Sequence, residues 1–278
     1  MEWIYGRNVV QLALAAGARR RAHKLAATPP ALKALRSSLP PGLHVDTMDT
    51  HALDELTGSR DHQGVALQVD AFAYATADEV LGAEIVVVLD EVSDPRNLGA
   101  TARSALAAGA GGLVVPRRRS ASVTPAAVKA SAGTIEHLPV AQVTNVVSFL
   151  KAAKDAGSWV YGAAGEARSS YVDLDLSGRL VLVFGAEGRG LRPLVARTCD
   201  ALASVPMEKP VESLNVSVAA ALFLFEARRQ RRAAAGGPAG GDARGGRRAA
   251  QERTWHRPLN GHHAHDARGG EGDAHDPQ

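Results

Sequence analysis

The sequence predicts an α/β protein whose larger part is a mainly parallel sheet covered by helices. Between about residues 84 and 232, strand-like and helix-like stretches alternate at the spacing typical of parallel strands joined by helical crossovers. The run Ile85-Val86-Val87-Val88-Leu89 is continuously apolar and mostly β-branched, which indicates a strand buried on both faces. We expect further strands at residues 113–115, 159–161, 180–184 and 203–205, and helices at residues 98–108, 125–131, 146–156 and 213–232.

A smaller α/β domain is predicted for residues 1–70, followed by a short Ala-rich linker at residues 71–83. The apolar patterns favour helices at residues 8–16, 30–39 and 50–57, the last capped by Thr50, and strands at residues 24–28, 44–48 and 64–69. The first loop of this domain gathers Arg19, Arg20, Arg21, His23 and Lys24. This cluster is either a solvated loop or a patch that binds a phosphate backbone.

The composition is typical of a globular protein, with 45% hydrophobic and 22% charged residues. No apolar run approaches the ~20 residues that cross a bilayer, and the first residues lack the basic and apolar regions of a signal peptide. Cys199 is the only cysteine, which excludes an intrachain disulfide and a metal site built from cysteines. We therefore expect a cytoplasmic protein with no membrane partner and no metal.

The positive charge of the chain belongs to its C-terminal segment. Residues 1–227 hold 22 Lys/Arg against 23 Asp/Glu, a net of −1, whereas residues 228–278 hold 10 against 6, a net of +4. Residues 233–278 are mostly Gly, Ala, Arg and His and are expected to be disordered, because this composition cannot build a core. Any nucleic-acid site in the folded part must therefore be a local patch.

Polar and glycine-rich loops follow three of the predicted strands, where ligands bind to parallel sheets. After the first strand, Asp94-Pro95 indicates a turn, Asn97 is suited to cap the next helix, and Arg103 is expected to share roughly one helix face with Asn97. By themselves these residues favour a simple helix cap and an exposed arginine over a functional site. The sequence continues with a second such loop after residues 180–184.

The second loop is Gly185-Ala186-Glu187-Gly188-Arg189-Gly190-Leu191. Its glycines suit a backbone that approaches a ligand closely, although a tight turn explains them too. The spacing matches neither the dinucleotide fingerprint nor the phosphate loop. The third loop, residues 205–217, begins with Val205-Pro206-Met207 and places Ser213, Asn215 and Ser217 at the start of a helix, which is more polar residues than one cap requires.

Together the three loops resemble the three signature motifs of the SpoU/TrmH family, within the SPOUT class of RNA methyltransferases. The order, the spacing and the strand-to-helix context agree, and Ser131-Ala132-Gly133 is also typical. The segments Tyr5-Gly6-Arg7-Asn8-Val9 and His62-Gln63-Gly64-Val65 resemble the small L30e-like substrate-binding domain of the family. The resemblance covers residues 2–232, and the bacterial 23S rRNA guanosine methyltransferases are similar in layout.

The resemblance implies an S-adenosylmethionine-dependent RNA 2′-O-ribose methyltransferase that acts on a guanosine of 23S rRNA. It implies a SPOUT domain at residues 84–232 with a deep trefoil knot. It also implies that S-adenosylmethionine is contacted by Gly185, Val205, Met207 and Leu214.

The same resemblance assigns Asn97, Arg103, Glu187 and Asn215 to catalysis. Free arginine has a pKa of about 12.5 or more, so an unaided Arg103 is a weak base at neutral pH. We expect Arg103 to fix the adjacent phosphate and to stabilise the developing alkoxide, while Asn97 orients Arg103 or the ribose. Glu187 is expected to pair with Arg103 or to position the nucleotide, and Asn215 to complete the pocket.

The predicted last helix carries Val218, Leu222, Leu224 and Phe225, a broad apolar surface. It either packs on its own sheet or meets a second copy, and the resemblance implies a homodimer whose active sites borrow a residue from the partner. Two other functions stay open. One is a non-catalytic RNA-binding or ribosome-assembly factor on the same scaffold, and the other is the same chemistry on tRNA or in antibiotic resistance.

Overall fold

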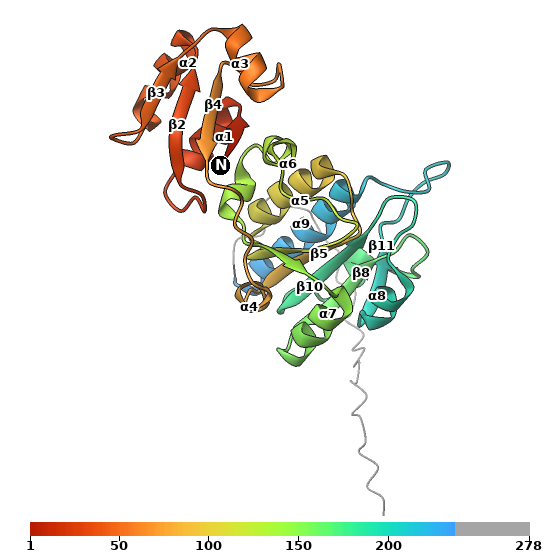
Figure 1. Cartoon of the computed structure of the whole chain (residues 1–278). Helices are drawn as coiled ribbons and strands as arrows, with labels where there is room; N and C mark the ends of the chain where they lie inside the picture. Colours follow the sequence, from red (N-terminus) through yellow and green to blue (C-terminus); the bar gives the residue numbers. More distant parts are fainter. Residues whose placement is uncertain (237–278) are drawn as a thin grey trace, which may run out of the picture. The chain divides into compact units, whose positions relative to one another are not determined.

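The computed structural model of the chain describes residues 1–236 (Figure 1). These residues form two β-sheets with helices packed around them. Most of the segment expected to be disordered, residues 237–278, lies outside the described residues. Within residues 1–236, no helix combines the length and the apolar character that a bilayer crossing requires.

The first sheet is formed by residues 2–69 and has the strand order β1-β4-β2-β3. Strands β1 and β2 are antiparallel to β4, and β3 is parallel to β2. Its elements are β1 (Glu2–Tyr5), α1 (Arg7–Leu14), β2 (Ala22–Ala27), α2 (Pro29–Leu35), a 3-10 turn (Arg36–Ser38), β3 (His44–Thr47), α3 (Thr50–Thr57) and β4 (Val65–Val69). The expected elements are confirmed and β1 is additional. The cap of α3 is Asp49 and not Thr50, because the Asp49 carboxylate accepts a hydrogen bond from the Ala52 N–H at 2.8 Å.

The second sheet has seven strands in the order β7-β6-β5-β10-β8-β11-β9, all parallel. Its strands are β5 (Ile85–Asp90), β6 (Gly112–Pro116), β7 (Val140–Val143), β8 (Trp159–Ala163), β9 (Ser169–Ser170), β10 (Leu180–Gly185) and β11 (Ala201–Ser204). Its helices are α4 (Ala77–Leu81), α5 (Pro95–Ala108), α6 (Pro125–Ala130), α7 (Val146–Asp155), α8 (Pro193–Thr198) and α9 (Val216–Ala234), with 3-10 turns at Thr134–His137 and Tyr171–Asp173. The predicted parallel sheet is thus confirmed, with β7, β9 and α8 as elements that were not expected.

Helix α4 lies in the stretch that was expected to be a plain linker. Thr76 caps it through its hydroxyl, and the Glu79 side chain reaches back to the Thr76 N–H at 2.6 Å. This reciprocal capping box satisfies two backbone donors at once and starts a helix of only five residues. The weak apolar pattern of residues 71–83 concealed it.

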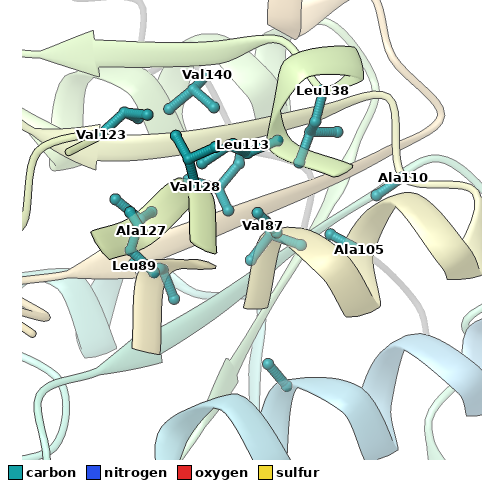
Figure 2. Close-up of a cluster of buried hydrophobic side chains, with 14 of the residues drawn as sticks. Val87, Leu89, Ala105, Ala110, Leu113, Val123, Ala127, Val128, Leu138 and Val140 are labelled. Atoms are coloured by element: carbon teal, nitrogen blue, oxygen red, sulfur yellow. The ribbon is translucent and has the colours of Figure 1, made fainter. Parts of the chain in front are cut away.

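Both faces of the large sheet are covered, as the continuous apolar run of β5 predicted. All six residues of β5 are buried. Val87 and Leu89 join the cluster that includes Leu113 and side chains of α5 and α6, shown in Figure 2. Val86 and Val88 point the other way, into a cluster that includes side chains of α7. Each such side chain contributes roughly 1.5–3 kcal/mol by leaving water. Because successive side chains of β5 face opposite sides of the sheet, this strand packs against a helical layer on each side.

The carboxyl ends of the parallel strands place three loops side by side. Strand β10 pairs with β5 on one side and with β8 on the other, and β8 pairs in turn with β11. Gly185 at the end of β10 is in register with Asp90 at the end of β5. The loops after β5, β10 and β11 therefore leave the sheet at one edge, where ligands of such sheets bind.

Candidate active site

Three polar side chains from three separate loops meet at this edge of the sheet. The Asn97 carboxamide donates a hydrogen bond to Glu187 Oε1 at 3.0 Å. The Asn215 carboxamide donates to the same carboxylate oxygen at 2.6 Å and to Asn97 Oδ1 at 2.9 Å. The Val216 N–H also approaches Glu187 Oε1, at 3.4 Å. One carboxylate oxygen thus holds all three loops together.

Asn97 takes part in this cluster because another residue caps its helix. The Asp94 carboxylate accepts from the Arg96 N–H at 2.8 Å, and Pro95 occupies the first helical turn, where proline is favoured. The expectation that Asn97 caps α5 was therefore wrong. Its carboxamide lies inside the first two turns and is free to contact Glu187.

The loop that carries Glu187 closes on itself through glycine. The Gly190 N–H donates to the Ala186 carbonyl at 2.8 Å, and Gly188 and Gly190 adopt left-handed backbone conformations, with φ of 74° and 64°. A Cβ atom on Gly185 would lie 2.1 Å from the Gly190 carbonyl carbon. We expected these glycines to let a ligand approach, and the structure shows that Gly185 is first needed for the loop to pack against itself.

Asn215 has two functions in the structure. Its Oδ1 accepts from the Ser217 N–H at 2.9 Å and from the Ser217 hydroxyl at 2.6 Å, which caps α9. Its Nδ2 remains available for Asn97 and Glu187. The expectation of a polar cap with additional contacts is confirmed for Asn215, whereas Ser213 is exposed and lies outside the helix.

Arg103 does not join the three side chains. It lies on α5, is exposed, and makes no side-chain hydrogen bond or ion pair to any described residue. Six residues at 3.6 per turn place Arg103 about 120° around the helix from Asn97. The expected shared face of Asn97 and Arg103 was therefore wrong, because two helical turns require seven residues rather than six.

The residues expected to contact S-adenosylmethionine lie at the end of β10 and in the loop after β11, and their chemistry fits an adenosyl group. Gly185, Val205, Met207 and Leu214 are all partly buried. Within residues 1–236, the N–H groups of Met207 and Leu214 donate to no protein acceptor. Partly exposed apolar side chains beside unused backbone donors suit a flat purine with a polar edge.

An ion pair between buried Asp90 and half-exposed Arg192, which the sequence analysis did not identify, anchors the second loop to the first strand. The Asp90 side chain is fully buried and accepts from Arg192 Nε at 2.9 Å and from the Arg192 N–H at 3.1 Å. Hydrogen bonding to Asp90 raises the pKa of the Arg192 guanidinium above its ordinary value. A charged residue at the end of a continuous apolar strand was the available signal, because a buried charge requires a partner.

A hollow of about 300 Å³ lies beside this ion pair. Its lining residues are Glu91, Ala186, Arg189, Gly190, Leu191, Arg192 and Pro193. The lining includes none of Val205, Met207 and Leu214, so the hollow is distinct from the positions expected to contact the cofactor.

Three of the five basic residues in the first loop of the small domain are paired with carboxylates. Arg20 is buried and pairs with Glu2 and with the fully buried Glu136, and its guanidinium lies 5.5 Å from the centre of the Phe72 ring. His23 contacts Asp70 and Lys24 pairs with Asp46. Only Arg19 and Arg21 of the cluster remain exposed, so neither a fully solvated loop nor a five-residue phosphate-binding patch describes it.

Comparison with known proteins agrees with this architecture. The model of the SpoU rRNA Methylase family matches residues 84–225. A second model, for RNA 2′-O ribose methyltransferase substrate binding, matches residues 3–75. The two matches follow the two sheets.

Individual relatives resemble nearly the whole described chain. An uncharacterized tRNA/rRNA methyltransferase of Mycobacterium ulcerans is 43% identical over 241 residues, which are 83% of this chain and 78% of the relative. The 23S rRNA (guanosine-2′-O-)-methyltransferase RlmB of Xanthomonas campestris is 44% identical over 197 residues, 68% of this chain and 79% of that protein. The SpoU methyltransferase AviRb of Streptomyces viridochromogenes, solved in complex with AdoMet, superposes with a TM-score of 0.69 at 27% identity and covers 82% of this chain and 89% of its own.

The family models, the relatives and the three converging loops point to one conclusion. The chain belongs to the SpoU rRNA methylase family and is an S-adenosylmethionine-dependent RNA methyltransferase.

Proposed function

We propose that the protein methylates the ribose 2′-hydroxyl of a guanosine in 23S rRNA. The observation that carries the proposal is the cluster of Asn97, Glu187 and Asn215, which unites three loops at the ligand-binding edge of the sheet. The 44% identity to a 23S rRNA guanosine-2′-O-methyltransferase supports the choice of substrate. A substrate-binding module at residues 3–75 also favours a large RNA.

The cofactor pocket is proposed to be formed by Gly185, Val205, Met207 and Leu214. When bound there, S-adenosylmethionine supplies an electrophilic methyl group and needs no metal for the transfer. The chain after β11 returns from the far side of β8 to place α9 against α5. This return path supports our proposal that the domain contains the deep trefoil knot of the SPOUT class.

Asn97, Glu187 and Asn215 are proposed to orient the ribose and to keep the loops in register during transfer. The 2′-hydroxyl is a poor nucleophile, so the growing negative charge on its oxygen needs a positive group nearby. Arg103 is the residue we assign to that role, by fixing the adjacent phosphate and stabilising the alkoxide. Because its side chain makes no contact with the cluster of its own chain, we assign it to the active site of a partner subunit.

A homodimer is proposed to form through the exposed apolar face of α9. Val218 and Phe225 are 48% and 47% exposed, and a hollow of about 380 Å³ beside them is lined by Tyr171, Ala221 and Leu222. Large apolar patches on a soluble protein mark interaction sites. A second copy covers this face and brings its Arg103 to the cluster.

The proposal also covers the organisation of the chain. Residues 1–70 form an L30e-like substrate-binding domain, residues 71–83 connect it to the SPOUT domain at residues 84–232, and the protein acts in the cytoplasm. The antiparallel and parallel pairing of β1, β4, β2 and β3 in one small sheet supports the first of these assignments.

Methyl transfer to defined RNA tests the proposed function. Labelled S-adenosylmethionine is incubated with the protein and fragments of 23S rRNA, and the modified ribose is mapped by mass spectrometry. We expect label on one guanosine ribose, and none when that nucleotide is replaced by 2′-deoxyguanosine. Methylation of a base, or transfer to tRNA alone, would contradict the proposal.

A further inference from the structure

Three consecutive arginines lie at the same edge of the sheet as the candidate active site. Arg117, Arg118 and Arg119, here called the arginine turn, directly follow β6 and are all exposed. Strand β6 is the neighbour of β5, with Val114 in register with Val88. The arginine turn is therefore next to the loop after β5, which leads to Asn97.

The backbone of the arginine turn is held in one conformation. The Arg117 N–H donates to the Val143 carbonyl at 2.9 Å, and the Ala121 N–H donates to the Val92 carbonyl at 2.8 Å. Arg119 adopts a left-handed conformation, with φ of 59°, which is uncommon for a residue other than glycine. The turn is thus tied both to β7 and to the loop after β5.

Glu91 connects the arginine turn to the hollow beside the Asp90–Arg192 ion pair. Its Oε1 lies 3.7 Å from Arg119 Nη1 and 3.6 Å from Arg192 Nη1. Glu91 is one of the residues that line the 300 Å³ hollow, together with Arg189 and Arg192. Glu91 therefore joins the arginine turn to the hollow, and we treat the arginines of both as one surface.

Three positive charges of this surface are not compensated. Arg117, Arg118 and Arg189 make no ion pair and no side-chain hydrogen bond within residues 1–236, whereas Arg119 and Arg192 both have a carboxylate partner. Residues 1–227 as a whole carry a net charge of −1, so this local excess is not a consequence of a basic protein. Planar guanidinium groups bind phosphate through two parallel hydrogen bonds.

We infer that the arginine turn binds phosphate groups of the RNA backbone next to the methylated nucleotide. The inference rests on the proposed function, since it places the RNA at the edge where Asn97, Glu187 and Asn215 meet. Arg117 and Arg118 make the phosphate contacts. Arg119 instead pairs with Glu91, and its left-handed backbone shapes the turn. These arginines position the RNA and do not touch the reacting atoms.

The test is a double variant, Arg117→Ala with Arg118→Ala, compared with a matched pair. Lys151→Ala with Arg197→Ala removes the same charge from α7 and from the last turn of α8, away from the carboxyl edge of the sheet. Methylation of a 23S rRNA fragment is measured at several salt concentrations, with S-adenosylmethionine binding followed by calorimetry. We expect the KM for RNA to rise about tenfold in the arginine-turn variant, with kcat and cofactor affinity unchanged.

The salt dependence distinguishes phosphate contacts from other causes. The slope of log KM against log salt should become shallower by about 0.7 to 0.9 for each lost phosphate contact. Arg117→Lys with Arg118→Lys should retain most of that slope, because the charges are kept. If the KM and the slope of the arginine-turn variant equal those of the wild type or of the matched pair, the inference is overturned. In that case the activity of the wild type still supports the proposed function. A wild-type protein that methylates no RNA would instead overturn the proposed function itself.

Discussion

Asn97 and Glu187 are 90 residues apart in the chain, yet the carboxamide of one donates a 3.0 Å hydrogen bond to the carboxylate of the other. Asn215 completes the cluster by donating to both. Side-chain networks of this kind are worth more than the sum of their pairs. We therefore expect changes within the cluster to affect turnover in a coupled way.

Asn215→Asp tests the cluster without removing the helix cap. The new carboxylate still accepts from the Ser217 N–H, but it cannot donate to Glu187 and places a second negative charge beside it. We expect a fall in turnover of at least tenfold with a change of thermal midpoint of only a few degrees. Asn215→Ala, which also removes the cap, should cost about 1 kcal/mol more in stability. Equal turnover in wild type and Asn215→Asp would show that the cluster is only structural.

Arg103→Ala should reduce turnover by about 100-fold or more if the guanidinium stabilises the alkoxide. Its exposure predicts a stability change within about 0.5 kcal/mol, and cofactor binding should persist. Single-turnover methylation at saturating RNA and cofactor measures the effect. Arg103→Lys keeps the charge but loses the planar fork, so a severe defect there would indicate bidentate positioning.

Mixed dimers show in which subunit Arg103 acts. Equal amounts of Arg103→Ala and Asn215→Asp protein are unfolded, mixed and refolded, so that half of the dimers contain one copy of each. If Arg103 serves the partner, each mixed dimer has one intact site, and about one quarter of wild-type activity returns. If Arg103 acts within its own chain, both sites of a mixed dimer are defective and no activity returns.

Gly185→Ala should disturb the second loop even though the added group is a single methyl. The Cβ would lie 2.1 Å from the Gly190 carbonyl carbon and 2.4 Å from the Leu191 nitrogen, so the loop backbone must move. We expect weaker S-adenosylmethionine binding by calorimetry and a lower thermal midpoint. Gly178→Ala is the matched control, because its Cβ would meet nothing within 4 Å. Normal affinity in Gly185→Ala would contradict the proposed cofactor loop.

Arg20→Met should destabilise the protein strongly, because it leaves the fully buried Glu136 without its partner. Breaking a buried pair from one side costs about 3–5 kcal/mol, measured here by denaturant unfolding. The double change Arg20→Met with Glu136→Leu should recover much of this loss, since no buried charge then remains unpaired. A double variant no more stable than Arg20→Met alone would contradict this explanation.

The stability of the protein should decrease above pH 9. Burial raises the pKa of the Cys199 thiol and of the Tyr161 hydroxyl to about 12 each, from ordinary values of 9.0 and 10.0. The folded state therefore keeps protons that the unfolded chain releases, and the stabilisation is lost as pH rises from 9 towards 12. Thermal unfolding at pH 8 to 11 measures the trend, and Cys199→Ala should make it shallower. A thermal midpoint independent of pH in this range would contradict the prediction.

The sequence alone determined five of the seven strands of the large sheet, though not β7 and β9, and the three loops at its edge. Strand β5 was evident because a strand buried on both faces is apolar at every position, which gives an unbroken apolar run. The loops were identifiable because glycine, proline and polar residues follow strands in a fixed order. Loop chemistry of this kind depends on consecutive residues, and the resemblance to the SpoU family rests on the same residues.

Tertiary structure alone decided which of these residues meet. Asn97 was expected to be a helix cap. In the structure Asp94, three residues earlier, caps the helix, so the Asn97 side chain is available to contact Glu187. Arg20 looked like part of a solvated patch until its carboxylate partner, Glu136, was brought to it from 116 residues away. Asp90 and Arg192 are 102 residues apart, and the local pattern indicates only that Asp90 needs a partner, not which residue supplies it. Such pairs depend on which strands are neighbours in the sheet, and strand order is fixed by the packing of the whole domain rather than by any one segment.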